Sequence, residues 1–473
     1  MTSDELAFKP ATELRNMIAG KQVSPVELTE MYFKRIEKFD GQLNNYLTLN
    51  RDEAMKQAHA AEQAVMKGEK LGPLHGLPIS IKDLEITRGL RTTGGSLAYK
   101  DRIPDEDSVV AERIRNAGAV ILGKTNTPEF GLIGRTENRL GDPCRNPWNP
   151  QRTTGGSSGG AGGSVIAGLC ALAQGSDGGG SIRIPSSYCG IYGIKPTLGR
   201  TPRYSGRNAA RLTNHFSQLG PMTRTVRDSA MLLQVLAGFD ARDMNSLRET
   251  PQNYIAALDK PVKGMRIAWS PNYGYASVDP EVAQVCEKAA KTFESLGCIV
   301  EEVDFKLDSP FDSFWPIYCA MAFAAFGYLL TDHAEDLSDY GREYLEIGAT
   351  VTGAEYARAL GGMDHVRAQL TELLTKYDLL LSPTMAVPPF EHGKPPTTIA
   401  GKPADPFWGF LPFTYPINMA GNPAASIPAG FSREKLPIGL HIVGRRGDEA
   451  SIFTASAAFE QANPWMHERP PIS

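Results

Sequence analysis

Hydrophobic and polar positions follow two different periods along the chain. Apolar residues at helical spacing in 24–39, after a capping Ser24 and a proline at the first helical position, predict a long amphipathic helix. The same two patterns continue to the C-terminus and predict further helices at 108–118, 164–173, 227–238, 280–296 and 449–462, and strands at 78–83, 119–123, 266–270, 298–305, 378–383 and 437–444. This alternation predicts an α/β fold layered around one sheet.

Three segments depart from the alternation. The polar stretch 239–264 is either a linker between domains or a surface loop within one domain. The region 383–406 contains seven prolines and is expected to be an irregular lid, binding loop or disordered segment. The run 314–330 carries no charge, and its length is at the lower limit for a spanning helix. We expect it to be a buried or pocket-lining helix, ahead of a membrane-surface patch or a span.

Charge and composition exclude several classes of protein. The chain of 473 residues has a net charge of −4 and no block of Lys or Arg, which disfavours nucleic acid and anionic membranes as partners. Its N-terminus lacks the pattern of a signal peptide, so we expect a cytoplasmic protein without stable membrane insertion. The six cysteines form no CxxC pair and the histidines no HExxH motif, so free thiols are expected and neither a metal nor another cofactor.

Two short motifs match by accident. The segment 118–125 fits the phosphate-loop pattern GxxxxGK[ST], but its middle residues, Ala-Val-Ile-Leu, predict a buried strand rather than a loop around phosphates. The segment 155–159 fits the nucleophile-elbow pattern GxSxG, but the residues before it are predicted to form a loop rather than a strand. Neither motif supports nucleotide binding or an α/β-hydrolase site.

A glycine-rich segment is the best candidate for a reactive site. Glycine is by far the most frequent residue of 151–181, yet an apolar stretch interrupts the glycines, which argues against a flexible linker. Gly178, Gly179 and Gly180 directly precede Ser181. Backbone N–H groups beside a hydroxyl supply the minimum for acyl transfer, namely a nucleophile and an oxyanion hole.

The segments around this site resemble the amidase signature family. They are PISIKD (78–83), KTNTPEFG (124–131), GGSSGG (155–160), GSDGGGSIRIPSSYCGIYGIKPTLGR (175–200), LGPMTRTVRD (219–228) and, near the C-terminus, MAGNPAASIPAGF and LPIGLHIVG. The resemblance implies a single domain over 1–473, with a central mixed, twisted sheet covered by helices on both faces. It further implies a catalytic core at about 65–235 and a variable pocket region at about 300–420.

The resemblance also implies roles for individual residues. Lys82 would be the catalytic lysine, Ser157 a bridging serine held through a cis peptide bond, and Ser181 the nucleophile, with the same spacing between the two serines as in the family. The N–H groups of the four residues Gly178, Gly179, Gly180 and Ser181 would form the oxyanion hole, while Ser158, Asp177 and Arg183 would brace the loops. Gly178 departs from the family pattern, in which a larger residue often stands at this position.

The implied chemistry requires a neutral lysine. A lysine amine has an ordinary pKa of about 10.4. Burial in the apolar run 78–81 would lower the pKa of Lys82 and allow it to take a proton from Ser181 through Ser157.

The implied substrate is a small apolar or aromatic amide, cleaved through an acyl-enzyme. Phe130, Gly131, Trp315 and Tyr318 are the candidate pocket residues. A carbamate (urethane) or ester hydrolase, and a glutaminase-type subunit of a tRNA-dependent amidotransferase that needs partner subunits, remain alternatives. So does a scaffold protein without catalysis. We expect a monomer or a homodimer.

Overall fold

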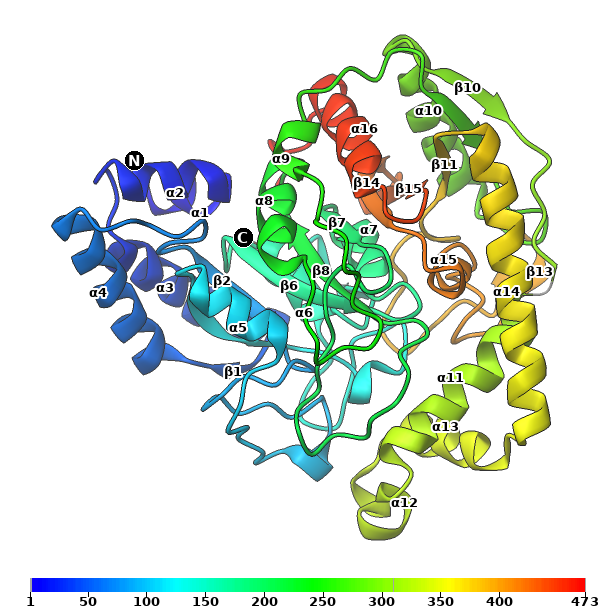
Figure 1. Cartoon of the computed structure of the whole chain (residues 1–473), viewed down its shortest axis with the longest axis horizontal. Coiled ribbons are helices and arrows are strands. Elements are labelled where there is room, and N and C mark those ends of the chain that lie inside the picture. The colour runs from blue at the N-terminus through cyan, green and yellow to red at the C-terminus, as the bar shows by residue number, and fades with distance from the viewer. Residues whose placement is uncertain (1, 309, 473) are drawn as a thin grey trace.

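An 11-stranded mixed sheet forms the centre of the computed structural model, which describes residues 2–308 and 310–472 (Figure 1). In spatial order the strands are β1 (Tyr46–Leu49), β3 (Val120–Thr125), β2 (Pro78–Lys82), β6 (Leu172–Asp177), β8 (Gln218–Thr223), β7 (Tyr192–Lys195), β14 (Ala424–Phe431), β15 (Pro437–Gly444), β11 (Leu379–Pro383), β9 (Arg266–Trp269) and β10 (Ile299–Glu302). Pairing is parallel within β3–β2–β6 and within β11–β9–β10, and antiparallel elsewhere in the sheet. The prediction of an α/β fold around one mixed sheet is therefore confirmed.

Alternate residues of the strands enter two different cores. In β11, Leu379 and Leu381 pack in a cluster that includes side chains of α10 and α16, whereas Leu380 points to an aromatic cluster on the other face. On the first face lie α8 (Val226–Leu236), α9 (Tyr254–Ala257), α10 (Pro280–Ser295) and α16 (Glu449–Ala462). The opposite cluster includes side chains from α7 (Arg183–Cys189), α11 (Pro310–Phe326), α12 (Leu329–Asp332), α13 (Asp339–Thr350), α14 (Gly353–Lys376) and α15 (Tyr415–Ala420).

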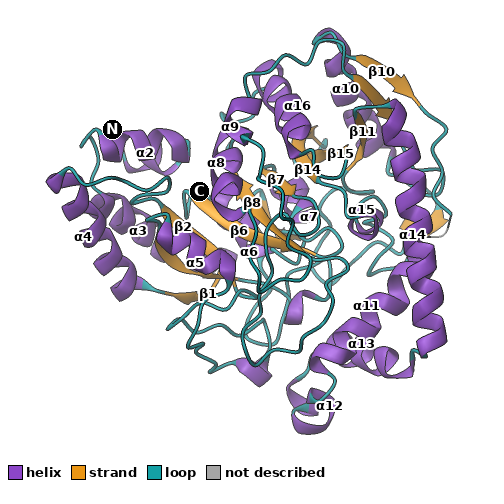
Figure 2. Ribbon diagram, viewed as in Figure 1, coloured by secondary structure: helices purple, strands orange, loops and turns teal. Residues whose placement is uncertain are grey.

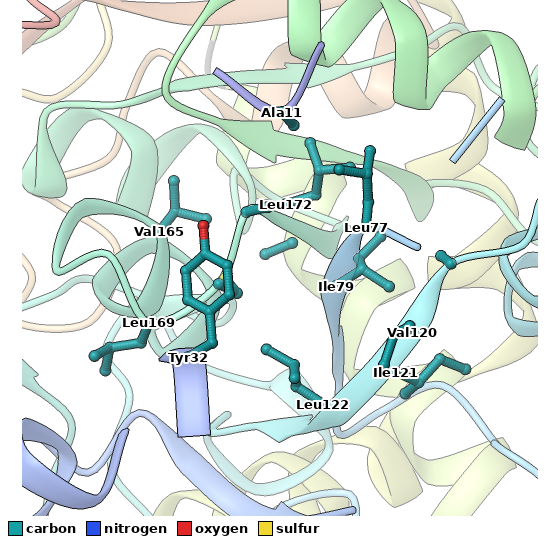
Figure 3. Packing of buried hydrophobic residues seen from close by; sticks show 14 of the residues in the cluster. Ala11, Tyr32, Leu77, Ile79, Val120, Ile121, Leu122, Val165, Leu169 and Leu172 are labelled. Atoms are coloured by element: carbon teal, nitrogen blue, oxygen red, sulfur yellow. The ribbon is translucent and has the colours of Figure 1, made fainter. Parts of the chain in front are cut away.

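A third core fills the N-terminal half of the molecule. There Ile79, Val120 and Leu172 of neighbouring strands meet Tyr32 and Val165 from flanking helices (Figure 3). The helices of this half are α1 (Ser3–Ala7), α2 (Ala11–Ala19), α3 (Pro25–Leu43), α4 (Arg51–Lys67), α5 (Val109–Asn116) and α6 (Gly159–Ile166). Figure 1 shows α1–α4 on the left of the view and α11–α14 on the right, and the continuous sheet joins the two halves.

The helix predicted at 164–173 is wrong over most of its length, because α6 spans Gly159–Ile166 and only 164–166 are shared. Helix α6 ends at Ile166, because Gly168 adopts a left-handed conformation with φ of 66° and turns the chain into β6. The other predicted helices and strands are found within a few residues of their expected bounds. In particular, β3 runs through Lys124 and Thr125, as the strand interpretation of 118–125 requires.

Two loop predictions also need correction. The residues before GGSSG form a two-stranded ribbon of β4 (Arg145–Asn146) and β5 (Asn149–Thr153), apart from the central sheet. The proline-rich region 383–406 contains a short hairpin of β12 (Thr398–Ile399) and β13 (Lys402–Pro403). The stretch 239–264 runs from α8 to β9 and carries α9, so it connects elements packed on the same sheet.

The uncharged run 314–330 forms most of α11 and the start of α12, which pack beside α13 and α14 (Figure 2). Buried Phe314 and Ile317 face the aromatic cluster, in agreement with the expectation of a buried or pocket-lining helix. In the part of the chain that the structure describes, no helix has both the length and the apolarity to cross a membrane.

Gly160 in α6 allows a close approach of three backbone segments. A Cβ atom there would lie 2.4 Å from both the amide nitrogen of Asn126 and the carbonyl oxygen of Asn45. We therefore expect Gly160→Ala to lower the free energy of unfolding by about 1–3 kcal/mol, because backbone atoms must move apart. Chemical denaturation with circular dichroism measures this change.

The matched control is Gly41→Ala in α3, where a Cβ atom would meet no atom within 4 Å. Alanine favours the helix there by up to about 1 kcal/mol. Equal shifts in the two variants would contradict the packing explanation.

Candidate active site

Lys82 lies at the C-terminal end of β2 and is completely buried. Its Nζ atom is 2.7 Å from Ser157 Oγ and 3.0 Å from Ser176 Oγ. Burial lowers the pKa of Lys82 to about 7, although the charges of Asp177 and Glu85 act in the opposite direction. A substantial fraction of the amine is therefore neutral near pH 7 and able to accept a proton.

Ser157 follows a cis peptide bond from Gly156, as the family resemblance implied. The next residue, Ser158, donates its backbone N–H to the carbonyl oxygen of Ser181 at 3.1 Å and its hydroxyl to the carbonyl oxygen of Ser176 at 3.1 Å. These two bonds attach the segment that carries Ser157 to the segment that carries Ser181. Lys82 Nζ is thus hydrogen-bonded to Ser157, and the backbone of Ser181 is hydrogen-bonded to the residue that follows Ser157.

The loop that carries Ser181 connects β6 to α7, and Ser181 is partly exposed at its end. The N–H of Gly180 donates to Asp177 Oδ1 at 2.8 Å, so this donor is already engaged. Among the described residues, no acceptor is found for the N–H groups of Gly178, Gly179 and Ser181. Three of the four expected oxyanion donors are therefore free to bind an anion.

A buried ion pair fixes this loop to the body of the protein. Asp177 and Arg183 are both fully buried, and Arg183 Nε lies 2.9 Å from Asp177 Oδ2. Burial alone would raise the pKa of Asp177, but the charge and hydrogen bonds of Arg183 hold it well below its ordinary value. Asn418 Nδ2 donates to both the carboxylate and the backbone carbonyl of Asp177, at 2.9 Å in each case. Asp177 thus links the loop to Arg183 of α7 and to Asn418 of α15.

The four candidate pocket residues lie on two segments that touch each other. Gly131 lies against the bridging serine, since a Cβ atom there would be 3.1 Å from Ser157 Oγ. The Tyr318 hydroxyl donates to the carbonyl oxygen of Leu132 at 3.0 Å, and Phe130 stacks on a phenylalanine of α11 at 4.1 Å between ring centroids. Trp315 lies one helical turn from Tyr318, with ring centroids 6.2 Å apart. Helix α11 therefore supports the loop beside Ser157.

Three residues at the site, Ser176, Trp408 and Thr414, escaped prediction, whereas Phe314 belongs to the run that was expected to line a pocket. Trp408 and Phe314 lie directly against the loop, since a Cβ atom at Gly179 would be 3.3 Å and 3.4 Å from their rings. Thr414 donates its hydroxyl to the Gly179 carbonyl at 2.7 Å. Ser176, which contacts Lys82, is visible in the motif GSDGGGS, but no local pattern marks Trp408 or Thr414, because they approach the loop only in the folded chain.

The described residues contain no group of three or more His, Cys, Asp or Glu side chains that could hold a metal ion. The six cysteines are buried free thiols. Burial raises the pKa of the Cys170 thiol, which makes it a poor nucleophile.

Known proteins are similar to this chain in sequence and in fold. The family model Amidase matches residues 27–453. An acylamidase of Rhodococcus erythropolis is 38% identical, with 99% of this chain and 98% of the relative covered. The A subunit of the glutamyl-tRNA(Gln) amidotransferase of Moorella thermoacetica is 37% identical, with 99% of each chain covered.

The crystal structure of a bacterial aryl acylamidase of the amidase signature family superimposes with a TM-score of 0.92 at 35% identity, covering 97% of each chain. Together these similarities identify an amide-hydrolysing enzyme that acts on C–N bonds. The chain belongs to the amidase signature family.

Proposed function

We propose that the protein hydrolyses small apolar or aromatic amides through an acyl-enzyme on Ser181, with Ser157 and Lys82 as the proton relay. The observation that carries this proposal is the 2.7 Å separation of Lys82 Nζ and Ser157 Oγ in a buried site that lowers the lysine pKa to about 7. A lysine in this state is a competent general base at neutral pH.

In the proposed reaction, Ser181 Oγ attacks the carbonyl carbon of the amide. Its proton passes to Ser157 as the proton of Ser157 passes to neutral Lys82. The N–H groups of Gly178, Gly179 and Ser181 stabilise the negative oxygen of the tetrahedral intermediate. The intermediate collapses as Lys82 returns a proton through Ser157 to the leaving nitrogen, and water then cleaves the acyl-enzyme by the same relay.

An aromatic wall beside the loop supports the choice of substrate. Phe314, Trp408 and Tyr415 contact one another, with centroid distances of 5.1 Å for Phe314–Trp408 and Phe314–Tyr415. Two of these rings approach Gly179. All three rings are buried next to the loop, and in this proposal they form the apolar boundary against which an aryl or alkyl group of the substrate packs.

The same machinery would accept carbamates and esters, because both transfer an acyl group to serine. A glutaminase role with partner subunits is the other alternative, given the similarity to the amidotransferase of Moorella thermoacetica. The aromatic wall favours an apolar group over the ammonium and carboxylate of glutamine. Turnover of anilides, carbamates, esters and glutamine by the purified chain distinguishes these activities.

We expect Ser181→Ala to reduce kcat by about 10⁴-fold or more, because the covalent step is lost. Lys82→Ala should cost about 10³-fold, because the base is lost. A fluorophosphonate probe with mass spectrometry should label Ser181 in the unmodified protein and fail to label it when Lys82 is replaced. The control Ser205→Ala changes an exposed serine and should keep both turnover and labelling. Full activity of Ser181→Ala would refute the assignment.

We expect kcat/KM for an uncharged anilide to rise with pH and level off above about pH 8. The neutral amine of Lys82 is the active form, and its pKa of about 7 sets the midpoint, so activity is lost as pH falls through that value. Initial rates measured at each pH at which the protein remains folded give this profile. A midpoint near the ordinary lysine value of 10.5 would contradict a buried neutral base.

We expect Trp408→Ala to reduce kcat/KM for an anilide by about 10- to 100-fold, with a smaller loss for acetamide, because the aryl group loses its contact. The matched control is Trp465→Ala, a tryptophan with the same 8% exposure in the core on the opposite face of the sheet. It should lower stability without changing the ratio of the two substrates. An unchanged ratio in Trp408→Ala would argue against an aromatic substrate group.

A further inference from the structure

The three glycines before Ser181 differ in what a side chain would meet. A Cβ atom at Gly180 would lie 2.4 Å from Thr414 Oγ1, and its φ of 130° also favours glycine. A Cβ atom at Gly179 would lie within 3.4 Å of the rings of Phe314 and Trp408. A Cβ atom at Gly178 would meet only Ser217 Cβ, at 3.9 Å. Packing and backbone conformation therefore require glycine at 180, packing leaves little room for a side chain at 179, and neither requires glycine at 178.

The space left by Gly178 has a fixed boundary on its far side. Ser217 belongs to a turn closed by two hydrogen bonds, in which Asn214 Nδ2 donates to the Ser217 carbonyl at 2.6 Å and the Ser217 N–H donates to Asn214 Oδ1 at 2.8 Å. The preceding Phe216 packs on Phe314 of the aromatic wall, 4.9 Å between centroids. The turn that holds Ser217 is therefore fixed to the aromatic wall. It does not move into the space beside Gly178.

This space is open to the exterior and adjoins the proposed nucleophile. Gly178 and Ser181 are both partly exposed, whereas Gly179 and Gly180 between them are buried. The N–H of Gly178 is free among the described residues, so a carbonyl held in the oxyanion hole would lie beside the space. Apart from Ser217 and the chain neighbours of Gly178, no described residue has an atom within 4 Å of the position that a Cβ atom of Gly178 would occupy, so a substituent attached to that carbonyl can extend over Gly178 with Ser217 beside it.

We propose that Gly178 determines the size of the substrate, because its missing side chain leaves room beside the scissile bond for a bulky substituent bounded by Ser217. This inference rests on the proposed function, since it places the substrate at Ser181. The family pattern often has a larger residue at position 178. In this proposal glycine stands there because of the size of the substrate, not because the backbone conformation requires it.

The test narrows the space from each side in turn. Gly178→Val adds a side chain on the loop, and Ser217→Val adds volume from the opposite wall without altering the loop's N–H donors. Each variant is assayed with p-nitroanilides of acetic, butyric and benzoic acid, and with acetamides of ammonia, aniline and 2-naphthylamine. We expect both variants to lower the ratio of kcat/KM for the largest to the smallest substrate by about tenfold or more in one of the two series. The affected series identifies whether the acyl or the amine group occupies the space.

Equal losses on large and small substrates in both variants would overturn the proposal, as would an unchanged ratio in both series. Gly180→Ala is the control for a glycine that packing requires, and it should lower the melting temperature and the turnover of every substrate. The labelling of Ser181 tests the proposed function separately. If the probe labelled another serine, that function would fail, whereas an altered size ratio would still locate the substrate beside Gly178.

Discussion

The buried carboxylate of Asp177 is the interaction on which the site depends. It ends β6 and accepts hydrogen bonds from the N–H groups of Gly180 and Ile182, from the guanidinium of Arg183 and from Asn418. Those partners belong to the loop that carries Ser181, to α7 and to α15, which lies in a distant part of the sequence. One charge thus fixes both the direction of the free N–H groups and the position of the wall opposite them. Burying this charge is stable only because Arg183 neutralises it within the same cluster.

The same neutralisation explains how a lysine close to Asp177 can lose its charge. An unpaired carboxylate near Lys82 would stabilise the protonated amine and raise its pKa. Because Arg183 forms bonds with both carboxylate oxygens, much of that field is compensated, and burial of Lys82 dominates. The ion pair and the neutral lysine are therefore two consequences of one arrangement. A change that weakened the ion pair of Asp177 and Arg183 would also raise the pKa of Lys82.

The sequence predicts the elements and local motifs well, because they depend on periodicity and on neighbouring residues. The strand that carries Lys82 and the glycines before Ser181 are examples. It fails where a single backbone angle decides, as at Gly168, which ends α6 early. It also fails where contacts are long-range: Thr414 binds the Gly179 carbonyl from a distant part of the chain, and Trp408 lies just beyond the proline-rich region. The engagement of the Gly180 N–H by Asp177 likewise appears only in three dimensions.

The difference between the predictable and the unpredictable parts of the site has a physical basis in what each part must do. Acyl transfer needs a base, a nucleophile and N–H donors at fixed separations, and in the proposed mechanism short segments of 82–183 with strong sequence signals supply them. Substrate selection needs only surfaces of suitable size, and we propose that these come from α11, α15 and the turn around Ser217. Of the residues on these surfaces, only Asn418 of α15 donates a hydrogen bond to Asp177 among the described residues. Substitutions in the aromatic wall would therefore alter which substrate is accepted. The hydrogen bonds to Asp177, and with them the proposed reaction, would stay the same.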